Sequence, residues 1–331
     1  MFGKMIFALA ALGTAMAAHA QDGDDWTLVI HGGAGVLERG SMSPEYEAGQ
    51  HAALKAALEA GKAVLVDGGT SLDAVQAAIR VLEDHPGFNA GHGAVFNAAG
   101  TIELDAAIMN GADRNAGAVA GITTTRNPID LARAVMDKSP HVMLQGVGAD
   151  EFSREQELAQ VPNSYFETDR RRAQLEKMQS GEDVSHSLNI ERKYGTVGAV
   201  ARDQSGDLAA ATSTGGMTGK RFGRVGDVPV LGAGTYADNA SCAVSATGAG
   251  EYYIRANVAA SICARIRYLG EDVQTAADAV QADMKSLGGS GGVIVVGADG
   301  TPAYSFNSEG MYRGMALSDG TISTAIYGDE Q

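Results

Sequence analysis

The feature that most constrains the fold is a hairpin in the middle of the chain. Two runs of small and β-branched residues, 196–201 and 208–214, flank the segment Asp203-Gln204-Ser205-Gly206-Asp207. This segment has the composition of a short hairpin loop, with a glycine available for the left-handed position. Two antiparallel strands are therefore predicted side by side.

The same loop predicts which residues of the hairpin face each other. If Asp203 pairs with Asp207, Thr196 lies opposite Thr214, whereas a slip of one residue would put Gly215 there instead. Opposed side chains on one face of a sheet lie about 4.5–5.5 Å apart at Cβ. A hydrogen bond between the two threonine hydroxyls is therefore expected.

A long polar segment ends abruptly at Thr196. Residues 160–193 hold three consecutive arginines, several acids and little apolar periodicity, which predicts a partly disordered linker, or else an exposed insertion. Cleavage of the Gly195–Thr196 bond would explain its position. The freed α-amine, with an ordinary pKa of about 7.7–8.0, could then take the proton of the adjacent hydroxyl. None of the seven histidines lies in an obvious Ser-His-Asp or Cys-His arrangement.

The other predicted elements indicate a layered α/β sandwich with helices on both sides of central sheets. Helix starts are expected at Ser43-Pro44, Thr70 and Asn127-Pro128, from their capping residues. Two later helices are predicted at 251–268 and 272–286. The other strands are predicted at 27–30, 117–122, 142–147, 230–236, 240–246, 292–296 and 303–306.

The first twenty residues are expected to be a signal peptide. Lys4 precedes a short apolar run, and Ala18-His19-Ala20 forms an A-x-A cleavage site. The mature protein is then periplasmic or secreted, and a buried N-terminal helix is the alternative. No other apolar run is long enough to span a membrane.

Charge and cysteine content exclude some classes of protein. The net charge of −15 argues against a nucleic-acid partner, because phosphate backbones would repel the chain. The two cysteines, Cys242 and Cys263, are too few for a disulfide framework. We interpret them as buried free thiols, and a single bridge between them stays open as the alternative.

Several ordered motifs carry a family resemblance. The segments GTVGAVARDQSGDLAAATSTGG, GRVGD and ATGAGE resemble the plant-type (type III) L-asparaginases, also called isoaspartyl or β-aspartyl peptidases, which are N-terminal-nucleophile (Ntn) hydrolases. The resemblance covers nearly all of the mature chain. It includes HGGAG at 31–35, FNAGHGAVF at 88–96, ELDA at 103–106 and GGSGG at 288–292.

The resemblance implies an αββα four-layer sandwich and a precursor that cleaves itself between Gly195 and Thr196. Residues 21–195 would be the α subunit, which ends in a flexible linker, and 196–331 the β subunit, and together they form one domain. The mature protein would be a homodimer of αβ heterodimers. It would release aspartate from L-asparagine and from N-terminal β-aspartyl (isoaspartyl) dipeptides.

The resemblance also implies roles for individual residues. Thr196 would be the nucleophile, oriented by Thr214, and Asn89 would support it. Thr247 and the backbone N–H of Gly248 would form the oxyanion hole.

Two oppositely charged side chains would hold the substrate. Arg224 would bind the substrate α-carboxylate, for which a planar guanidinium is well suited. Asp227 and the carbonyl of Gly250 would accept the α-ammonium, and Gly248 would also contact the substrate.

No cofactor is expected for catalysis. The resemblance does imply the family's sodium-binding loop. Main-chain carbonyls, and not imidazoles, would surround this structural ion, since hard cations prefer oxygen. The carbonyls belong to Leu82, Glu83, His85, Phe88, Ala90 and His92.

Two alternative functions stay open. One is glycosylasparaginase, or N4-(β-N-acetylglucosaminyl)-L-asparaginase, a related enzyme that is often exported. The other is a non-enzymatic amino-acid-binding protein that uses Arg224 and Asp227 as its clamp. Nucleotide binding by HGGAG is not favoured, because the motif lacks a following Lys-Ser/Thr and the G-x-G-x-x-G spacing.

Overall fold

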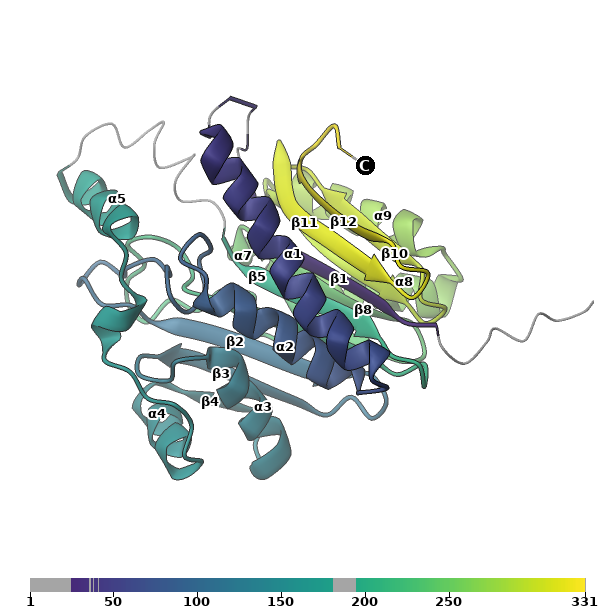
Figure 1. Ribbon diagram of the computed structural model, residues 1–331, viewed down its shortest axis with the longest axis horizontal. Helices are drawn as coiled ribbons and strands as arrows, with labels where there is room; N and C mark the ends of the chain where they lie inside the picture. The colour runs from purple at the N-terminus through teal and green to yellow at the C-terminus, as the bar shows by residue number, and fades with distance from the viewer. Residues whose placement is uncertain (1–24, 36, 38, 41, 181–194, 331) are drawn as a thin grey trace, which may run out of the picture.

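The computed structural model (Figure 1) describes residues 25–35, 37, 39–40, 42–180 and 195–330. The predicted signal peptide lies outside these residues, as does the later part of the predicted linker, residues 181–194. Within the described ranges, no helix combines the length and the apolar character that a membrane span requires.

Two sheets form the centre of the molecule. The larger has eight strands, which in spatial order are β12 (Ile322–Tyr327), β11 (Gly310–Leu317), β1 (Thr27–Gly35), β5 (Val197–Arg202), β6 (Leu208–Thr214), β2 (Leu104–Asn110), β3 (Ala116–Ile122) and β4 (Met143–Gln145). The smaller has four, β10 (Pro302–Phe306), β9 (Gly291–Gly297), β8 (Cys242–Gly248) and β7 (Thr235–Asp238). Strand pairs are antiparallel except for β3 with β4.

Helices cover the outer faces of both sheets (Figure 1). The outer face of the larger sheet packs on α1 (Pro44–Val66), α2 (Ser71–Asp84) and α3 (Pro128–Lys138). The smaller sheet packs on α7 (Gly250–Ala256), α8 (Val258–Leu269) and α9 (Val273–Ser286). The remaining helices are α4 (Gly146–Glu155), the 3₁₀ helix η1 (Asn163–Phe166) and α5 (Asp169–Ser180).

Strand alternation explains the layers. On β1, Leu28 and Ile30 belong to the core under the helices, whereas Val29 belongs to the core between the two sheets. Successive side chains of a strand point to opposite faces, so a strand with helices on one side and a second sheet on the other is apolar on both. The predicted αββα sandwich is confirmed.

The predicted helix starts are largely confirmed by their capping bonds. Ser43 Oγ accepts from the Tyr46 N–H at 3.2 Å, and Thr70 Oγ1 accepts from the Asp73 N–H at 3.2 Å. Such caps contribute about 0.5–2 kcal/mol each. Asn127 precedes α3 without a side-chain cap bond.

The predicted hairpin register is confirmed. Val197 pairs with Ser213, which continues the expected pairing of Asp203 with Asp207 across the loop. The Asp203 N–H donates to the Asp207 carbonyl at 3.0 Å, and Gly206 adopts φ +85°. Thr196, immediately before β5, is therefore opposite Thr214.

The predicted linker is more ordered than its composition suggests. Residues 163–166 form η1 and 169–180 form α5, where Leu175 is buried and the Arg171 Nε donates to the Gly93 carbonyl at 2.7 Å. This helix has little apolar periodicity of its own. It contacts the loop around Gly93, which is distant from it in the sequence, so its own composition did not reveal it.

Other boundaries also differ from the predictions. The strand predicted at 230–236 is present only as β7, because residues before it turn through Gly232 at φ +94°. The helix predicted at 251–268 is interrupted at Asn257, which has φ +48°. Strand β4 ends at Gln145, where α4 begins, and strands β2, β11 and β12 were not predicted.

The interpretation of the two cysteines as free thiols is wrong. Cys242, at the start of β8, and Cys263, on α8, form a disulfide with a Cα–Cα distance of 5.3 Å. The helix packs directly on the inner strand of the smaller sheet, so residues 21 positions apart become neighbours. Sequence spacing alone could not show this contact.

Candidate functional site

The centre of the candidate site is a pair of threonine hydroxyls. Thr196 Oγ1 donates to Thr214 Oγ1 at 3.0 Å. Thr214 Oγ1 also accepts from the Gly216 N–H at 3.0 Å. Thr214 Oγ1 thus accepts two hydrogen bonds, and one of them holds the half-buried Thr196 hydroxyl at the open end of the hairpin.

Asn89 holds the peptide bond before Thr196. Its backbone N–H donates to the Gly195 carbonyl at 2.9 Å, and its side-chain Nδ2 donates to the Gly216 carbonyl at 2.7 Å. Asn89 therefore joins the two ends of the hairpin. These contacts place Asn89 beside Thr196, and its supporting role stays a prediction.

Residue 195 occupies a slot that admits only main chain. A Cβ added to Gly195 would lie 2.4 Å from the Asn89 Cβ, and one added to Gly33 would lie 2.8 Å from the Gly195 Cα. Gly33 has φ +114°, a conformation that favours glycine. The HGGAG segment therefore packs against the predicted cleavage site.

His31 contacts Thr196, the predicted nucleophile, from the neighbouring strand, a contact that the sequence did not indicate. Its Nδ1 lies 3.0 Å from the Thr196 carbonyl oxygen, and its Nε2 lies 3.0 Å from Ser245 Oγ. Burial lowers the pKa of His31 to about 3. The ring is therefore neutral at ordinary pH. The available signal was a histidine inside a buried strand, at the start of a glycine-rich motif.

Thr247 and Gly248 end strand β8 on the side of Thr196. Ala243 of the same strand packs between the sheets with Val200, toward the far end of β5. Four residues further along β8, Thr247 has the same orientation and lies toward Thr196. Its Oγ1 is buried and lacks a hydrogen-bond partner in the described part of the chain, as an unused donor for a reacting oxygen would.

The structure brings Arg224, Asp227 and Gly250 together. A Cβ on Gly250 would lie 2.8 Å from Asp227 Oδ1 and 2.9 Å from Arg224 Nη2. A Cβ on Gly216 would lie 3.4 Å from Arg224 Nη1, which connects this group to the Thr214 turn. The three residues thus lie beside the threonine pair.

Asp227 is a buried carboxyl with one oxygen free. Its Oδ2 has no hydrogen-bond partner among the described residues. Burial raises the pKa of Asp227 to about 7, against the opposing effect of Arg224. An ammonium group placed here would favour the charged form.

Arg224 has a partner that the sequence did not indicate. Its Nε and Nη2 donate to the two carboxylate oxygens of Glu251 at 2.9 and 3.0 Å. This bidentate pair orients the guanidinium toward Gly250. Arg224 Nη1 is then directed to the Gly216 side of the site.

The predicted sodium loop is a compact turn between α2 and β2. The Glu83 carbonyl accepts from the His92 N–H at 2.7 Å, and the carbonyls of Leu82 and His85 also accept one bond each. His92 Nδ1 pairs with the Tyr165 carbonyl at 2.7 Å. Among the described residues, no cluster of three or more His, Cys, Asp and Glu side chains could hold a metal ion.

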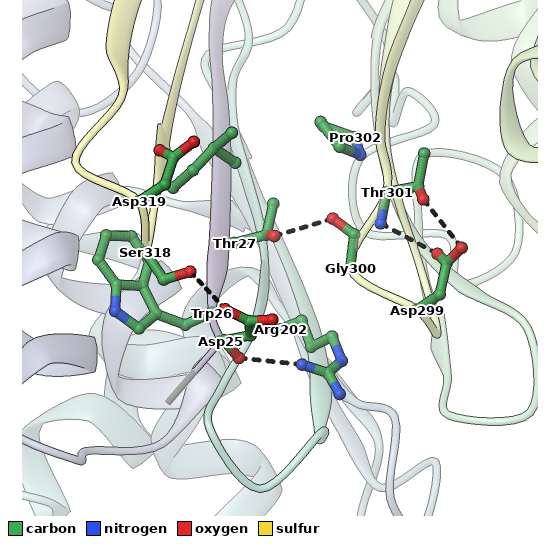
Figure 2. A pocket seen from close by; sticks show the side chains of 11 residues that line it. Asp25, Trp26, Thr27, Arg202, Asp299, Gly300, Thr301, Pro302, Ser318 and Asp319 are labelled. Atoms are coloured by element: carbon green, nitrogen blue, oxygen red, sulfur yellow. Dashed lines mark hydrogen bonds between the residues drawn. The ribbon is translucent and has the colours of Figure 1, made fainter. Parts of the chain in front are cut away.

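A polar pocket of about 290 Å³ lies at the opposite end of β5 (Figure 2). Arg202, the last residue of β5, lines it and donates to the Asp25 carbonyl at 2.9 Å. Thr27 Oγ1 donates to the Gly300 carbonyl at 2.8 Å. These two hydrogen bonds join segments that are far apart in the sequence, and the pocket is separated from Thr196 by the length of the strand.

An αββα sandwich with a threonine hydroxyl at the start of a central strand has the architecture of the Ntn hydrolases. The chain belongs to the asparaginase family, whose sequence profile matches residues 24–326.

Curated relatives agree over nearly their whole length. The isoaspartyl peptidase of Salmonella typhimurium is 48% identical over 306 residues, which are 91% of this chain and 98% of that protein. The isoaspartyl peptidase of Escherichia coli is 47% identical, with coverage of 91% and 95%. The isoaspartyl peptidase/L-asparaginase of Homo sapiens is 41% identical, with coverage of 92% and 96%.

Proposed function

We propose that this chain is an amidohydrolase that releases aspartate from L-asparagine and from N-terminal β-aspartyl dipeptides. The observation that carries the proposal is the Thr196 hydroxyl, 3.0 Å from the Thr214 hydroxyl and adjacent to the Gly195 carbonyl that the Asn89 N–H holds. The names of the relatives support the substrate class.

The first reaction in the proposal is self-cleavage. Thr196 Oγ1 attacks the Gly195 carbonyl carbon, and the negative charge that develops on the carbonyl oxygen is next to the Asn89 N–H, 2.9 Å away in the precursor. The C–N bond breaks as the leaving amine takes up the proton that the Thr196 hydroxyl lost, which leaves an ester. Water hydrolyses the ester and frees the α-amine, giving α subunit 21–195 and β subunit 196–331.

Turnover uses the same oxygen with a new base. The free Thr196 amine accepts the hydroxyl proton, and Oγ1 attacks the side-chain amide carbon of the substrate. The tetrahedral oxyanion is stabilised by Thr247 Oγ1 and the Gly248 N–H. Ammonia or an amino acid leaves with the proton, and water then releases aspartate from the β-aspartyl ester. These steps use only groups of the protein and water.

Recognition requires both charges of a free amino-acid end. Arg224 binds the α-carboxylate, while Asp227 and the Gly250 carbonyl bind the α-ammonium. The free Oδ2 of Asp227 supports this assignment, because a buried unpaired carboxylate oxygen is costly until a donor arrives.

We also propose that the loop 82–92 binds a structural sodium ion through its main chain. A carbonyl oxygen has two lone pairs, so the Leu82, Glu83 and His85 carbonyls that already accept one hydrogen bond can each contribute to a cation. The test is thermal unfolding in sodium chloride and in choline chloride of equal concentration, with a higher Tm expected in sodium.

Export and assembly are further parts of the proposal. The A-x-A segment before Gln21 supports a signal peptide, and the Cys242–Cys263 disulfide is typical of an oxidising compartment such as the periplasm. A homodimer of αβ heterodimers is proposed from the family resemblance, and its mass can be measured by light scattering.

Denaturing electrophoresis tests self-cleavage, and two substrates test specificity. The wild type should give two fragments, the smaller one beginning at Thr196 by N-terminal sequencing. Purified protein should release aspartate from L-asparagine and β-aspartyl-leucine. A marked preference for glycoasparagine would favour glycosylasparaginase instead, and an intact chain that binds amino acids without releasing ammonia would favour a binding protein.

A further inference from the structure

We propose that four buried residues, His31, Thr212, Thr235 and Ser245, form a directional hydrogen-bond chain that positions Thr196 relative to the substrate clamp. The inference rests on the proposed function and adds positioning residues to it. All four side chains are fully buried. They come from four strands in both sheets, β1, β6, β7 and β8.

The chain is continuous across the gap between the sheets. It starts at the Thr196 carbonyl, 3.0 Å from His31 Nδ1, and His31 Nε2 lies 3.0 Å from Ser245 Oγ. Ser245 Oγ lies 2.7 Å from Thr212 Oγ1, which lies 2.7 Å from Thr235 Oγ1. Four hydrogen bonds thus connect the nucleophile residue to the smaller sheet.

The direction of the bonds follows from the end at Thr196. A carbonyl only accepts, so His31 Nδ1 carries the proton, and the neutral ring then needs a donor at Nε2. Ser245 is that donor. Because its one proton is used, Ser245 accepts from Thr212, and Thr212 in turn accepts from Thr235.

Gly198 provides the space for this contact. On the larger sheet, His31 and Thr212 flank Gly198 in one row across β1, β5 and β6. A Cβ on Gly198 would lie 2.1 Å from both His31 Nε2 and Ser245 Oγ. The missing side chain leaves a notch into which Ser245 reaches from the other sheet.

The far end of the chain reaches the segment that carries Asp227. Thr235 Oγ1 lies 3.1 Å from the Val228 carbonyl, but its one proton goes to Thr212 in this chain, so the contact with Val228 is packing and not a fifth hydrogen bond. The chain therefore connects Thr196 to β7, the strand that follows the segment carrying Asp227. A missing hydroxyl would leave buried partners unpaired and let Thr196 shift.

The experiment compares Thr212→Val, which removes the central hydroxyl, with Thr212→Ser, which keeps it. Thr212→Val should lower kcat for β-aspartyl-leucine by about 10- to 100-fold, the size expected for a small misplacement of a reacting group. KM should change much less, and Thr212→Ser should restore most of the rate. Rates are expressed per cleaved active site.

Thr125→Val is a matched control. Thr125 is buried to the same degree and its Oγ1 donates to Ser153 Oγ at 2.7 Å, away from this chain. This variant measures how much kcat falls when a buried hydroxyl–hydroxyl hydrogen bond is lost outside the proposed hydrogen-bond chain. The inference is wrong if Thr125→Val and Thr212→Val reduce kcat equally, or if Thr212→Val leaves kcat unchanged.

A second measurement does not depend on activity. Nitrogen-15 NMR of the His31 ring should show a protonated Nδ1 and an unprotonated Nε2 in the wild type. Ser245→Ala should shift the Nε2 resonance. A wild-type His31 ring protonated at Nε2 would contradict the proposed hydrogen-bond chain even if the enzyme were active. An inactive wild type with the expected tautomer would instead overturn the proposed function and leave the chain supported.

Discussion

The two ends of the space between the sheets differ sharply although the same strands build them. At one end, a row of inward-facing residues across β1, β5 and β6 consists of Val29, Val200 and Ala210. Two residues along each strand, the corresponding row is His31, Gly198 and Thr212. The alternation of the strands is identical, so the backbone does not explain the difference.

What differs is the constraint on each row. The apolar row contributes by removing side chains from water, at about 25 cal/mol per Å². The polar row contributes little of that kind, and each of its groups must have a partner, because an unpaired buried polar group costs about 1–3 kcal/mol. The apolar end thus stabilises the sandwich, whereas the proposed role of the polar end is to orient the reacting groups.

The largest expected effect separates function from stability at the polar end. Thr196→Ala should leave the chain uncut and lower kcat by at least about four orders of magnitude, since the nucleophile is lost. Its circular dichroism spectrum should match that of the wild type. Electrophoresis and an ammonia assay measure both results, and measurable turnover by a pure, uncut variant would contradict the assignment.

The disulfide affects a strand that belongs to both ends. Strand β8 carries Ala243 in the apolar core and Thr247 at the site, and Cys242 ties its start to α8. The double variant Cys242→Ala/Cys263→Ala should lose about 2–4 kcal/mol of unfolding free energy in urea, as expected for a loop of this length.

Reductant provides the control for the disulfide. Reductant should not change the unfolding free energy of the double variant, which has no bridge to reduce. Any loss of stability that the double variant shows in reductant must therefore have a cause other than the bridge. An unfolding free energy equal to that of the wild type would show that the bridge does not constrain the unfolded chain.

A cavity at the apolar end should lower stability and leave activity unchanged, whereas Thr196→Ala should remove activity and leave the fold unchanged. Val200→Ala removes two buried methyl groups and should lower the unfolding free energy by about 2 kcal/mol. The kcat per cleaved site should stay close to the wild-type value. A fall in kcat as large as that of Thr212→Val would show that the two ends are not separate in function.

The smallest effect is a change in substrate affinity with pH. Because burial raises the pKa of Asp227 to about 7, its charged form is lost as the pH falls through 7, and not below 4 as for an ordinary aspartate. KM for L-asparagine should therefore rise about tenfold per pH unit below 7. A KM that is constant from pH 8 to pH 5.5 would show that Asp227 stays ionised.

The register of the hairpin could be predicted because a short loop of known chemistry fixes it. Arg224 and Asp227 could also be identified from the sequence, since one continuous motif contains both. The partners of His31 could not be predicted, because Ser245 is 214 residues away and reaches it only once the sheets pack. The same holds for the disulfide and for α5, which depend on contacts between distant segments.

Hydrogen exchange at the buried hydroxyl chain can report separation of the two sheets. No solvent reaches the protons of Thr212, Thr235 and Ser245 while the sheets remain together. Their exchange with deuterium would therefore report the rare events in which the whole sandwich separates, and not the local fraying of its loops.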